Sequence, residues 1–255
     1  MKLRQILNIL AFILVVAVNG LANSLPINNQ TTAAISDMYP VLFTPAGYVF
    51  SIWGLIYLGL LGFVIYQALP AQRDNPRLER VGYWFVWSCL FNSIWIFLWH
   101  YELMPLSVLV MAGLLVSLIV VYLRLEIGQT SVPTGEALFV RLPFSIYLGW
   151  ISVASIANVS VLLYDLGWNG FGTTEQAATV VMLAIGSLLG FIMVARHREV
   201  AYPLVLAWAF AGIVVRQSEF SLVVIGASVG AVAMLAAAAV GLVLRSRSRQ
   251  PRMGA

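Results

Sequence analysis

The sequence predicts an all-α, polytopic membrane protein, a bundle of about eight transmembrane helices. Hydrophobic residues make up 61% of the 255 residues and charged residues only 9%, with a mean hydropathy of +0.93. Soluble domains carry about 25% charged residues, so this composition excludes a soluble fold. The apolar runs are continuous and do not alternate as barrel strands do. Since only helices and closed barrels can span lipid, a helical bundle remains.

Eight apolar segments approach or exceed the length of about 20 residues that a helix needs to cross a bilayer. The seventh is the shortest, because Pro203 and Arg216 bound it. In chain order, the predicted spans are Gln5–Ala22, Gly47–Leu69, Val81–Trp99, Pro105–Leu123, Leu142–Leu163, Ala177–Ala195, Pro203–Val215 and Leu222–Leu244.

The first span also fits a second interpretation. Lys2 and Arg4 precede an apolar run that ends in the small residues Gly20 and Ala22, a pattern typical of a cleavable secretory signal. The run is long for a signal, and its retention places both termini in the cytoplasm. We therefore expect the first helix to be retained.

Basic residues between the spans predict the orientation, because Lys and Arg are kept on the cytoplasmic side. With both termini inside, 13 of the 14 basic residues fall in cytoplasmic segments, and only Arg216 lies outside. We expect an integral protein of the bacterial cytoplasmic membrane with an outer loop from Asn23 to Ala46. The basic tail, Ser246–Arg252, is typical of a segment that attracts anionic lipid, so no nucleic-acid partner is expected.

Three spans each carry a tryptophan with a polar or aromatic partner at helical spacing. A helix turns about 100° per residue, so the partners lie about 40°, 60° and 80° apart around their helices. An asparagine in hydrocarbon has four hydrogen-bonding positions to satisfy and should face the bundle or a wet cavity. The pairs are Trp53 with Tyr57, Asn92 with Trp95, and Trp150 with Asn158.

These pairs allow two interpretations. Indoles beside amides form an aromatic pocket with a few polar groups, which suits a flat, apolar ligand. Alternatively, the tryptophans pack the core, and Asn92 and Asn158 bond to each other or to backbone as links between helices, worth about 1 kcal/mol. The two interpretations do not exclude each other.

The same segments resemble a known family in motif and order. Pro45, Phe50 and Trp53-x3-Tyr57 are followed by Phe91-Asn92-x2-Trp95, and then by Trp150-x3-Ala154-Ser155-x2-Asn158. They are similar to the Pro-Pro-x3-Phe with Trp-x3-Tyr, the Leu-Asn-x2-Trp and the Trp-x3-Ala-[Ser/Thr]-x2-Asn of the translocator protein (TspO/MBR) family, also called tryptophan-rich sensory proteins. The chain departs from the pattern in its single Pro45 and in the spacing of Phe50 from Trp53, on the lid side of the pocket.

The resemblance covers roughly Gln5 to Trp168 and implies a five-helix core over residues 1–168. Residues 169–255 would then form a three-helix membrane extension with a basic cytoplasmic tail. The family resemblance also implies a homodimer and a cavity that opens toward the first loop. It implies binding of porphyrins, other tetrapyrroles or sterols. The ligand-binding residues expected from it are Trp53, Tyr57, Asn92, Trp95, Trp150, Ala154 and Asn158.

The function expected is that of a sensor or carrier for such a ligand. A membrane enzyme for oxidative or light-dependent porphyrin breakdown is one alternative, and a secondary transporter is the other. An ion-driven pump normally places an acidic residue in mid-membrane, and the acidic residues here fall in loops and at span ends. No cofactor other than a tetrapyrrole ligand and no metal are expected, since His100 and His197 lie on opposite predicted sides.

In the last three spans, small residues recur at a spacing of four. The two pairs are Gly186 with Gly190 and Gly226 with Gly230. Such pairs let helix backbones approach closely in lipid. We therefore expect these spans to pack as a tight unit against the core.

Overall fold

The structure, a computed structural model, describes residues 2–25, 27–168 and 172–249, with side chains through residue 246. All regular elements within these ranges are helical, and the eight predicted spans each fall on a long helix. These are α1 (Leu3–Ser24), α3 (Ile52–Ala68), α5 (Trp84–His100), α6 (Met104–Arg124), α8 (Leu142–Asp165), α9 (Glu175–His197), α10 (Ala201–Arg216) and α11 (Ser221–Arg249). The predicted class, a polytopic helical membrane bundle, is confirmed.

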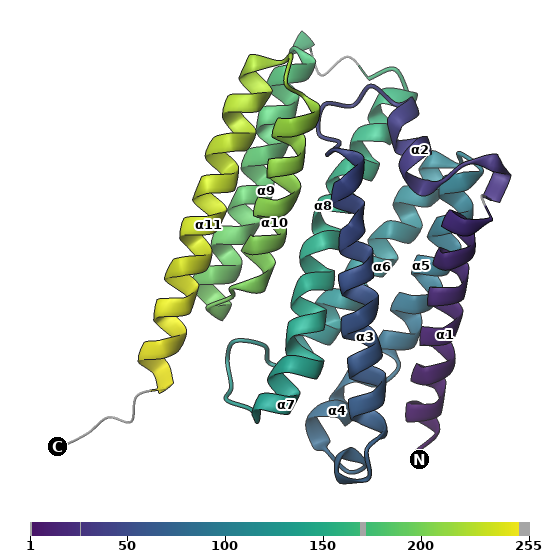
Figure 1. Cartoon of the computed structure of the whole chain (residues 1–255), viewed down its shortest axis with the longest axis vertical. Coiled ribbons are helices and arrows are strands. Elements are labelled where there is room, and N and C mark those ends of the chain that lie inside the picture. Colours follow the sequence, from purple (N-terminus) through teal and green to yellow (C-terminus); the bar gives the residue numbers. More distant parts are fainter. Residues whose placement is uncertain (1, 26, 169–171, 250–255) are drawn as a thin grey trace.

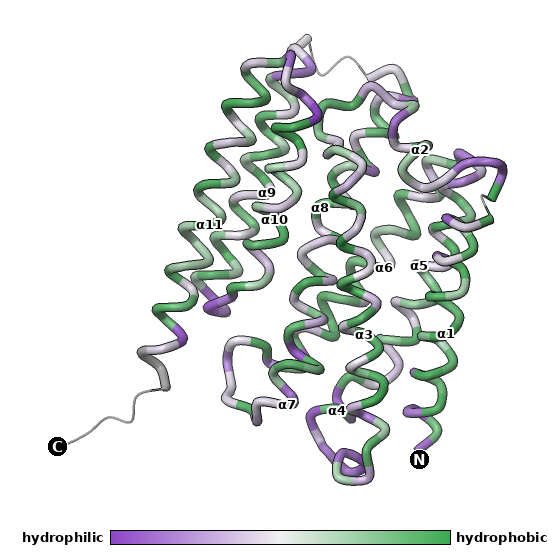
Figure 2. The backbone as a smooth tube through the Cα atoms, viewed as in Figure 1, coloured by the Kyte–Doolittle hydropathy of each residue, from purple (hydrophilic) through white to green (hydrophobic). Residues whose placement is uncertain are grey.

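Six helical segments of the described chain are long and apolar enough to cross a membrane. Helix α5, with 17 residues, and α10, with 16, are shorter. Hydrophilic residues gather at both ends of the bundle, whereas its middle is largely hydrophobic (Figure 2). A hydrophobic middle between two hydrophilic ends is what a protein needs to span a bilayer whose hydrocarbon core is about 30 Å thick.

Short helices connect the long ones at both ends. They are η1 (Ile27–Asn29), α2 (Thr32–Met38), η2 (Gly47–Ser51), η3 (Pro70–Gln72), α4 (Pro76–Val81), α7 (Thr134–Glu136) and the π-helix η4 (Ala137–Arg141). The prediction that the third span begins at Val81 was wrong. Val81 ends α4, because Gly82 adopts a φ of +61° that breaks the helix, and α5 begins at Trp84.

Helices α1, α3, α5, α6 and α8 form one group, and α9, α10 and α11 form a layer beside it (Figure 1). The layer packs on α8 mainly through α10. A Cβ built at Gly149 of α8 would lie 3.2 Å from Cβ of Val205 and 3.4 Å from Cα of Tyr202, so glycine lets the two backbones approach. Helix α1 begins and α11 ends at the same end of the bundle (Figure 1).

The segment that leads into α3 is bonded to helix α10. The Ala46 amide donates to the Gly212 carbonyl at 3.1 Å, and the Trp208 indole donates to the Val49 carbonyl at 3.1 Å. The Tyr48 ring also meets the Trp208 ring edge-on, with centroids 5.4 Å apart. The layer of α9–α11 therefore holds the outer loop as well as α8.

Candidate functional site

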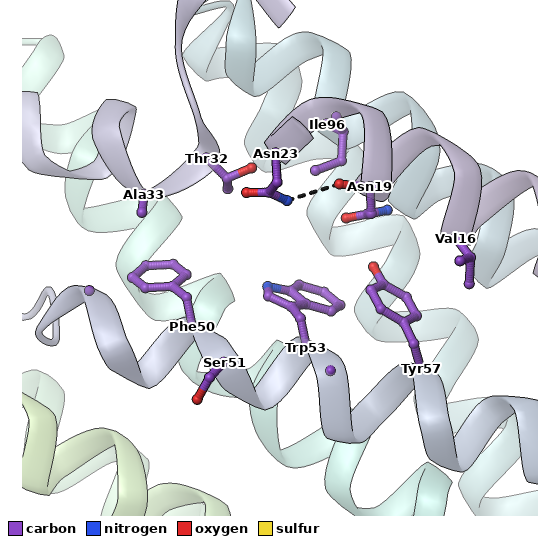
Figure 3. A pocket seen from close by; sticks show the side chains of 13 residues that line it. Val16, Asn19, Asn23, Thr32, Ala33, Phe50, Ser51, Trp53, Tyr57 and Ile96 are labelled. Carbon is purple, nitrogen blue, oxygen red and sulfur yellow. Dashed lines mark hydrogen bonds between the residues drawn. The ribbon is translucent and has the colours of Figure 1, made fainter. Parts of the chain in front are cut away.

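A cavity of about 460 Å³ lies between α1 and α3, under the loop that carries α2 (Figure 3). We call it the lateral cavity. Asn19 and Asn23 of α1 form one wall, Thr32 and Ala33 of α2 lie at the loop end, and η2 and α3 form the opposite wall. The same two long helices are joined near their other ends, where the Asn8 amide donates to Oε1 of Gln67 at 2.8 Å.

Three aromatic side chains follow each other along the α3 wall of the lateral cavity. Phe50, Trp53 and Tyr57 are spaced three and four residues apart, so continuous helical winding through η2 and α3 places them on one face. The Trp53 and Tyr57 rings are stacked, with centroids 5.5 Å apart and an interplanar angle of 17°. In Figure 3 these rings face Asn19 and Asn23 across the cavity.

The Tyr57 hydroxyl is buried, and the Asn92 side chain beside it lies outside normal hydrogen-bonding geometry, so the hydroxyl has no such partner among the described residues. A buried hydroxyl without a partner costs about 1–3 kcal/mol. A ligand acceptor in the lateral cavity, which Tyr57 lines, would remove that cost.

Behind Trp53 lies a second, much smaller space, the inner cavity, of about 40 Å³. Its lining includes Trp53, Trp95, Trp150, Ala154 and Asn158, which are five of the seven predicted site residues. The Trp53 and Trp150 rings meet edge-on, with centroids 6.3 Å apart. A space of this size holds water but not an aromatic ligand, since one water needs about 10–15 Å³ by this measure.

The buried Asn158 side chain is hydrogen-bonded to two neighbouring helices. The Trp95 indole of α5 donates to Oδ1 of Asn158 at 3.1 Å, and Nδ2 of Asn158 donates to the Ser107 hydroxyl of α6 at 2.9 Å. Asn158 thus links α5, α6 and α8. By contrast, the Trp150 indole N–H is buried and has no partner among the described residues.

Asn92 forms a separate hydrogen-bonded link and lines neither cavity. It is fully buried, its Oδ1 accepts from Nδ2 of Asn19 at 2.7 Å, and its Nδ2 donates to the Tyr147 hydroxyl at 2.9 Å. Trp53, Trp95, Trp150 and Asn158 therefore line one cavity, as helical spacing predicts, whereas Asn92, which was expected beside them, does not. Asn92 and Asn158 bond different partners, and Thr32, Phe50 and Trp53 line both cavities.

The contribution of α1 to the site was not predicted from the sequence. Asn19 lies in an apolar span, is 6% exposed and faces the core, where it holds Asn92 and lines the lateral cavity. The reasoning applied to Asn92 and Asn158 would have found it, because an amide in hydrocarbon must be satisfied inside the bundle.

The fold and this site define a class, a polytopic helical membrane protein with aromatic clusters around its cavities. A family model described as TSPO-like protein matches residues 5–241. The chain therefore belongs to the TSPO-like family, as the motifs predicted, and is an integral membrane protein. The match continues through α9, α10 and most of α11, so the last three helices lie within the family model. No curated protein and no solved structure matches the chain.

Proposed function

We propose that the protein binds a flat, apolar ligand, a porphyrin or related tetrapyrrole or a sterol-like molecule, in the lateral cavity, and acts as a sensor or carrier. The observation that carries the proposal is the row of Phe50, Trp53 and Tyr57 along a cavity of about 460 Å³. Ligand pockets typically measure about 300–1,000 Å³ and combine aromatic walls with a few polar groups.

The chemistry of the walls suits such a ligand. The half-buried Trp53 ring offers a face for an offset-stacked macrocycle. Tyr57, at one end of the row, has a hydroxyl free to donate to a ligand carbonyl or carboxylate. The Asn19 amide already donates to the Val15 carbonyl and to Asn92, which fixes its side chain as part of the wall.

Binding is favoured over catalysis or ion-coupled transport by the residues around the cavity. Among the described residues, no Asp, Glu, His, Cys, Lys or Arg lines the lateral cavity. Acid–base catalysis and proton-coupled transport mostly use such groups at the ligand, and Tyr57 is the titratable side chain among the described residues that line this cavity.

The test is a titration of the purified protein in detergent with protoporphyrin IX, followed by quenching of tryptophan fluorescence. We expect a dissociation constant in the micromolar range, about −8 kcal/mol. Trp53→Ala should weaken binding by on the order of 1–3 kcal/mol, because it removes the central ring of the wall. Trp150→Ala should have a smaller effect, since Trp150 lines the inner cavity behind Trp53.

Trp87→Ala is the matched control. Trp87 lies on α5, is 51% exposed and lines neither cavity, so its removal should leave the affinity unchanged. Circular dichroism establishes that each variant is folded. If Trp53→Ala and Trp87→Ala bind protoporphyrin equally well, the lateral cavity is not the ligand site.

A further inference from the structure

A third cavity, of about 540 Å³, lies between the five-helix group and the α9–α11 layer. We call it the basal cavity. Its walls are the loop after α6 at residues 127–132, the end of η4 with Arg141, the start of α8, the turn between α9 and α10 with Arg198 and Glu199, and Arg245 of α11. It shares no lining residue with the lateral cavity. It lies at the end of the bundle where α1 begins and α11 ends (Figure 1).

Arg141 is a buried cation that forms no salt bridge with the described residues, although the charges of Glu136 and Glu126 act on it from farther away. It is 8% exposed, and no carboxylate of the described residues lies within 4.0 Å of its guanidinium. Its Nη1 donates to the Thr130 carbonyl, and its Nη2 donates to the Leu125 carbonyl at 3.0 Å and to the Thr130 hydroxyl at 2.6 Å. A guanidinium has five N–H donors, and Nε here is buried without a partner. Unpaired buried charge is costly, so an anion beside Arg141 would be stabilising.

Glu199, the acidic residue that lines this cavity, already has its partners. It is 1% exposed, and its Oε2 accepts from the Tyr122 hydroxyl at 2.8 Å and from the Ser145 hydroxyl at 2.9 Å. Its Oε1 accepts from two backbone amides and pairs with Arg245 at 3.3 Å. Three arginines against one glutamate leave the described lining with an excess of two positive charges.

The walls of the basal cavity are held in place by backbone packing. Gly128 has a φ of +78°, and a Cβ there would lie 1.7 Å from the His197 carbonyl oxygen, so the loop rests directly on the end of α9. Arg198, the residue that follows α9, adopts the left-handed conformation with a φ of +51°. The π-helix η4 ends at Arg141, and π-helical turns are often found at functional sites.

We propose that the basal cavity binds a phosphate group, carried by the headgroup of an anionic lipid or by free phosphate. Arginine guanidinium groups together with hydroxyls are the donors that phosphate oxygens prefer. Thr130 and Ser131 supply hydroxyls in the same lining as Arg141 and Arg198. Basic pockets between helices at a membrane surface are suited to lipid headgroups. A bound phosphate would touch both the five-helix group and the α9–α11 layer.

The test is isothermal titration calorimetry of the full-length protein in detergent with three probes. They are a short-chain phosphatidylglycerol, a phosphatidylcholine of the same chain length, and inorganic phosphate. Arg198→Ala should weaken the binding of phosphatidylglycerol about tenfold, because it removes a charge-assisted hydrogen-bond donor. Arg196→Ala is the matched control, since Arg196 is exposed on the same helix end but does not line the cavity.

The probes separate the two sources of phosphate. If phosphatidylglycerol binds more tightly than inorganic phosphate, and Arg198→Ala weakens that binding, the ligand is a lipid headgroup. If inorganic phosphate binds more tightly, and Arg198→Ala weakens that binding, the ligand is a soluble phosphate. Equal binding of both lipids, no binding of any probe, or equal effects of Arg196→Ala and Arg198→Ala would overturn the proposal. Protoporphyrin affinity should be unchanged in Arg198→Ala, so this test and that of the lateral cavity can fail separately.

Discussion

The five-helix group and the α9–α11 layer are held together in different ways. In the group, buried amides connect helices: Asn19 bonds Asn92, Asn92 bonds Tyr147, and Trp95 bonds Asn158. In the layer, the Thr179 and Ser187 hydroxyls bond carbonyls of their own helix α9, and several close contacts between helices are made at glycines. Cβ atoms at Gly186 and Gly230 would each lie within about 3.1 Å of the Phe210 ring of α10.

Hydrogen-bonded amides and close packing at glycines are two ways to hold helices together in lipid. Both are needed because apolar burial between helices gives little driving force there. Hydrogen-bonded links tolerate gaps, and both ligand-sized and water-sized cavities occur among them in the five-helix group. Close glycine contacts leave little space between the helices. We therefore expect the group to respond to loss of a polar partner and the layer to respond to added volume.

The largest expected effect is that of added volume in the layer. A Cβ at Gly241 of α11 would lie 2.3 Å from the Glu199 carbonyl oxygen, a backbone atom that cannot rotate away. Gly241→Leu should lower the free energy of unfolding by about 3 kcal/mol, measured by denaturant titration in detergent. Ala239→Leu, on the exposed side of the same helix, should change it little. Equal losses in both variants would mean that close packing does not stabilise the layer.

The next effect concerns a polar link in the five-helix group. Asn92→Leu leaves the Asn19 amide and the Tyr147 hydroxyl without this shared partner, so unfolding should become easier by about 1–2 kcal/mol. Asn23→Leu is the control, because Asn23 is exposed and bonds only the Asn19 carbonyl of its own helix. A wild-type unfolding free energy in Asn92→Leu would show that the link contributes nothing.

The smallest effect is the coupling between Trp95 and Asn158. A double-mutant cycle with Trp95→Phe and Asn158→Leu isolates the hydrogen bond of 3.1 Å between them. Its interaction energy should be about 0.6 kcal/mol, the average for such bonds between membrane helices. Additive losses in the double variant would identify Asn158 as a partner of Ser107 alone.

The sequence predicted the long helices because hydropathy over about 20 residues is a strong local signal. It did not predict α2, α4, α7 or the π-helix η4, since these elements are short and depend on tertiary contacts. The pairing of Arg77 with Glu136, at 2.7 Å between Nε and Oε1, helps to place α7 and joins residues 59 positions apart. Propensity within a short window contains no information about such a partner.

For the site, helical spacing predicted that Trp53 and Tyr57 lie together, and the stacked rings follow from that spacing. Spacing could not predict that Trp53 lines two cavities, because this depends on side-chain positions set by α1 and α8. The roles of the predicted residues in ligand binding stay predictions, as does the division of the chain at residue 168. The basal cavity could not be predicted from the sequence either, because Arg141 and Arg198 are distant in the chain and only the fold places them in one lining.

The bonds between α10 and the segment before α3 have a mechanical consequence. Ala46 and Val49, bonded to Gly212 and Trp208, immediately precede Phe50, the first ring of the lateral cavity. A ligand that displaced Phe50 would also displace α10 through these bonds, and a shift of α10 would move Phe50. By thermodynamic linkage the influence is equal in both directions. If the cavity binds a ligand, the α9–α11 layer is bonded directly to the segment that a bound ligand would contact first.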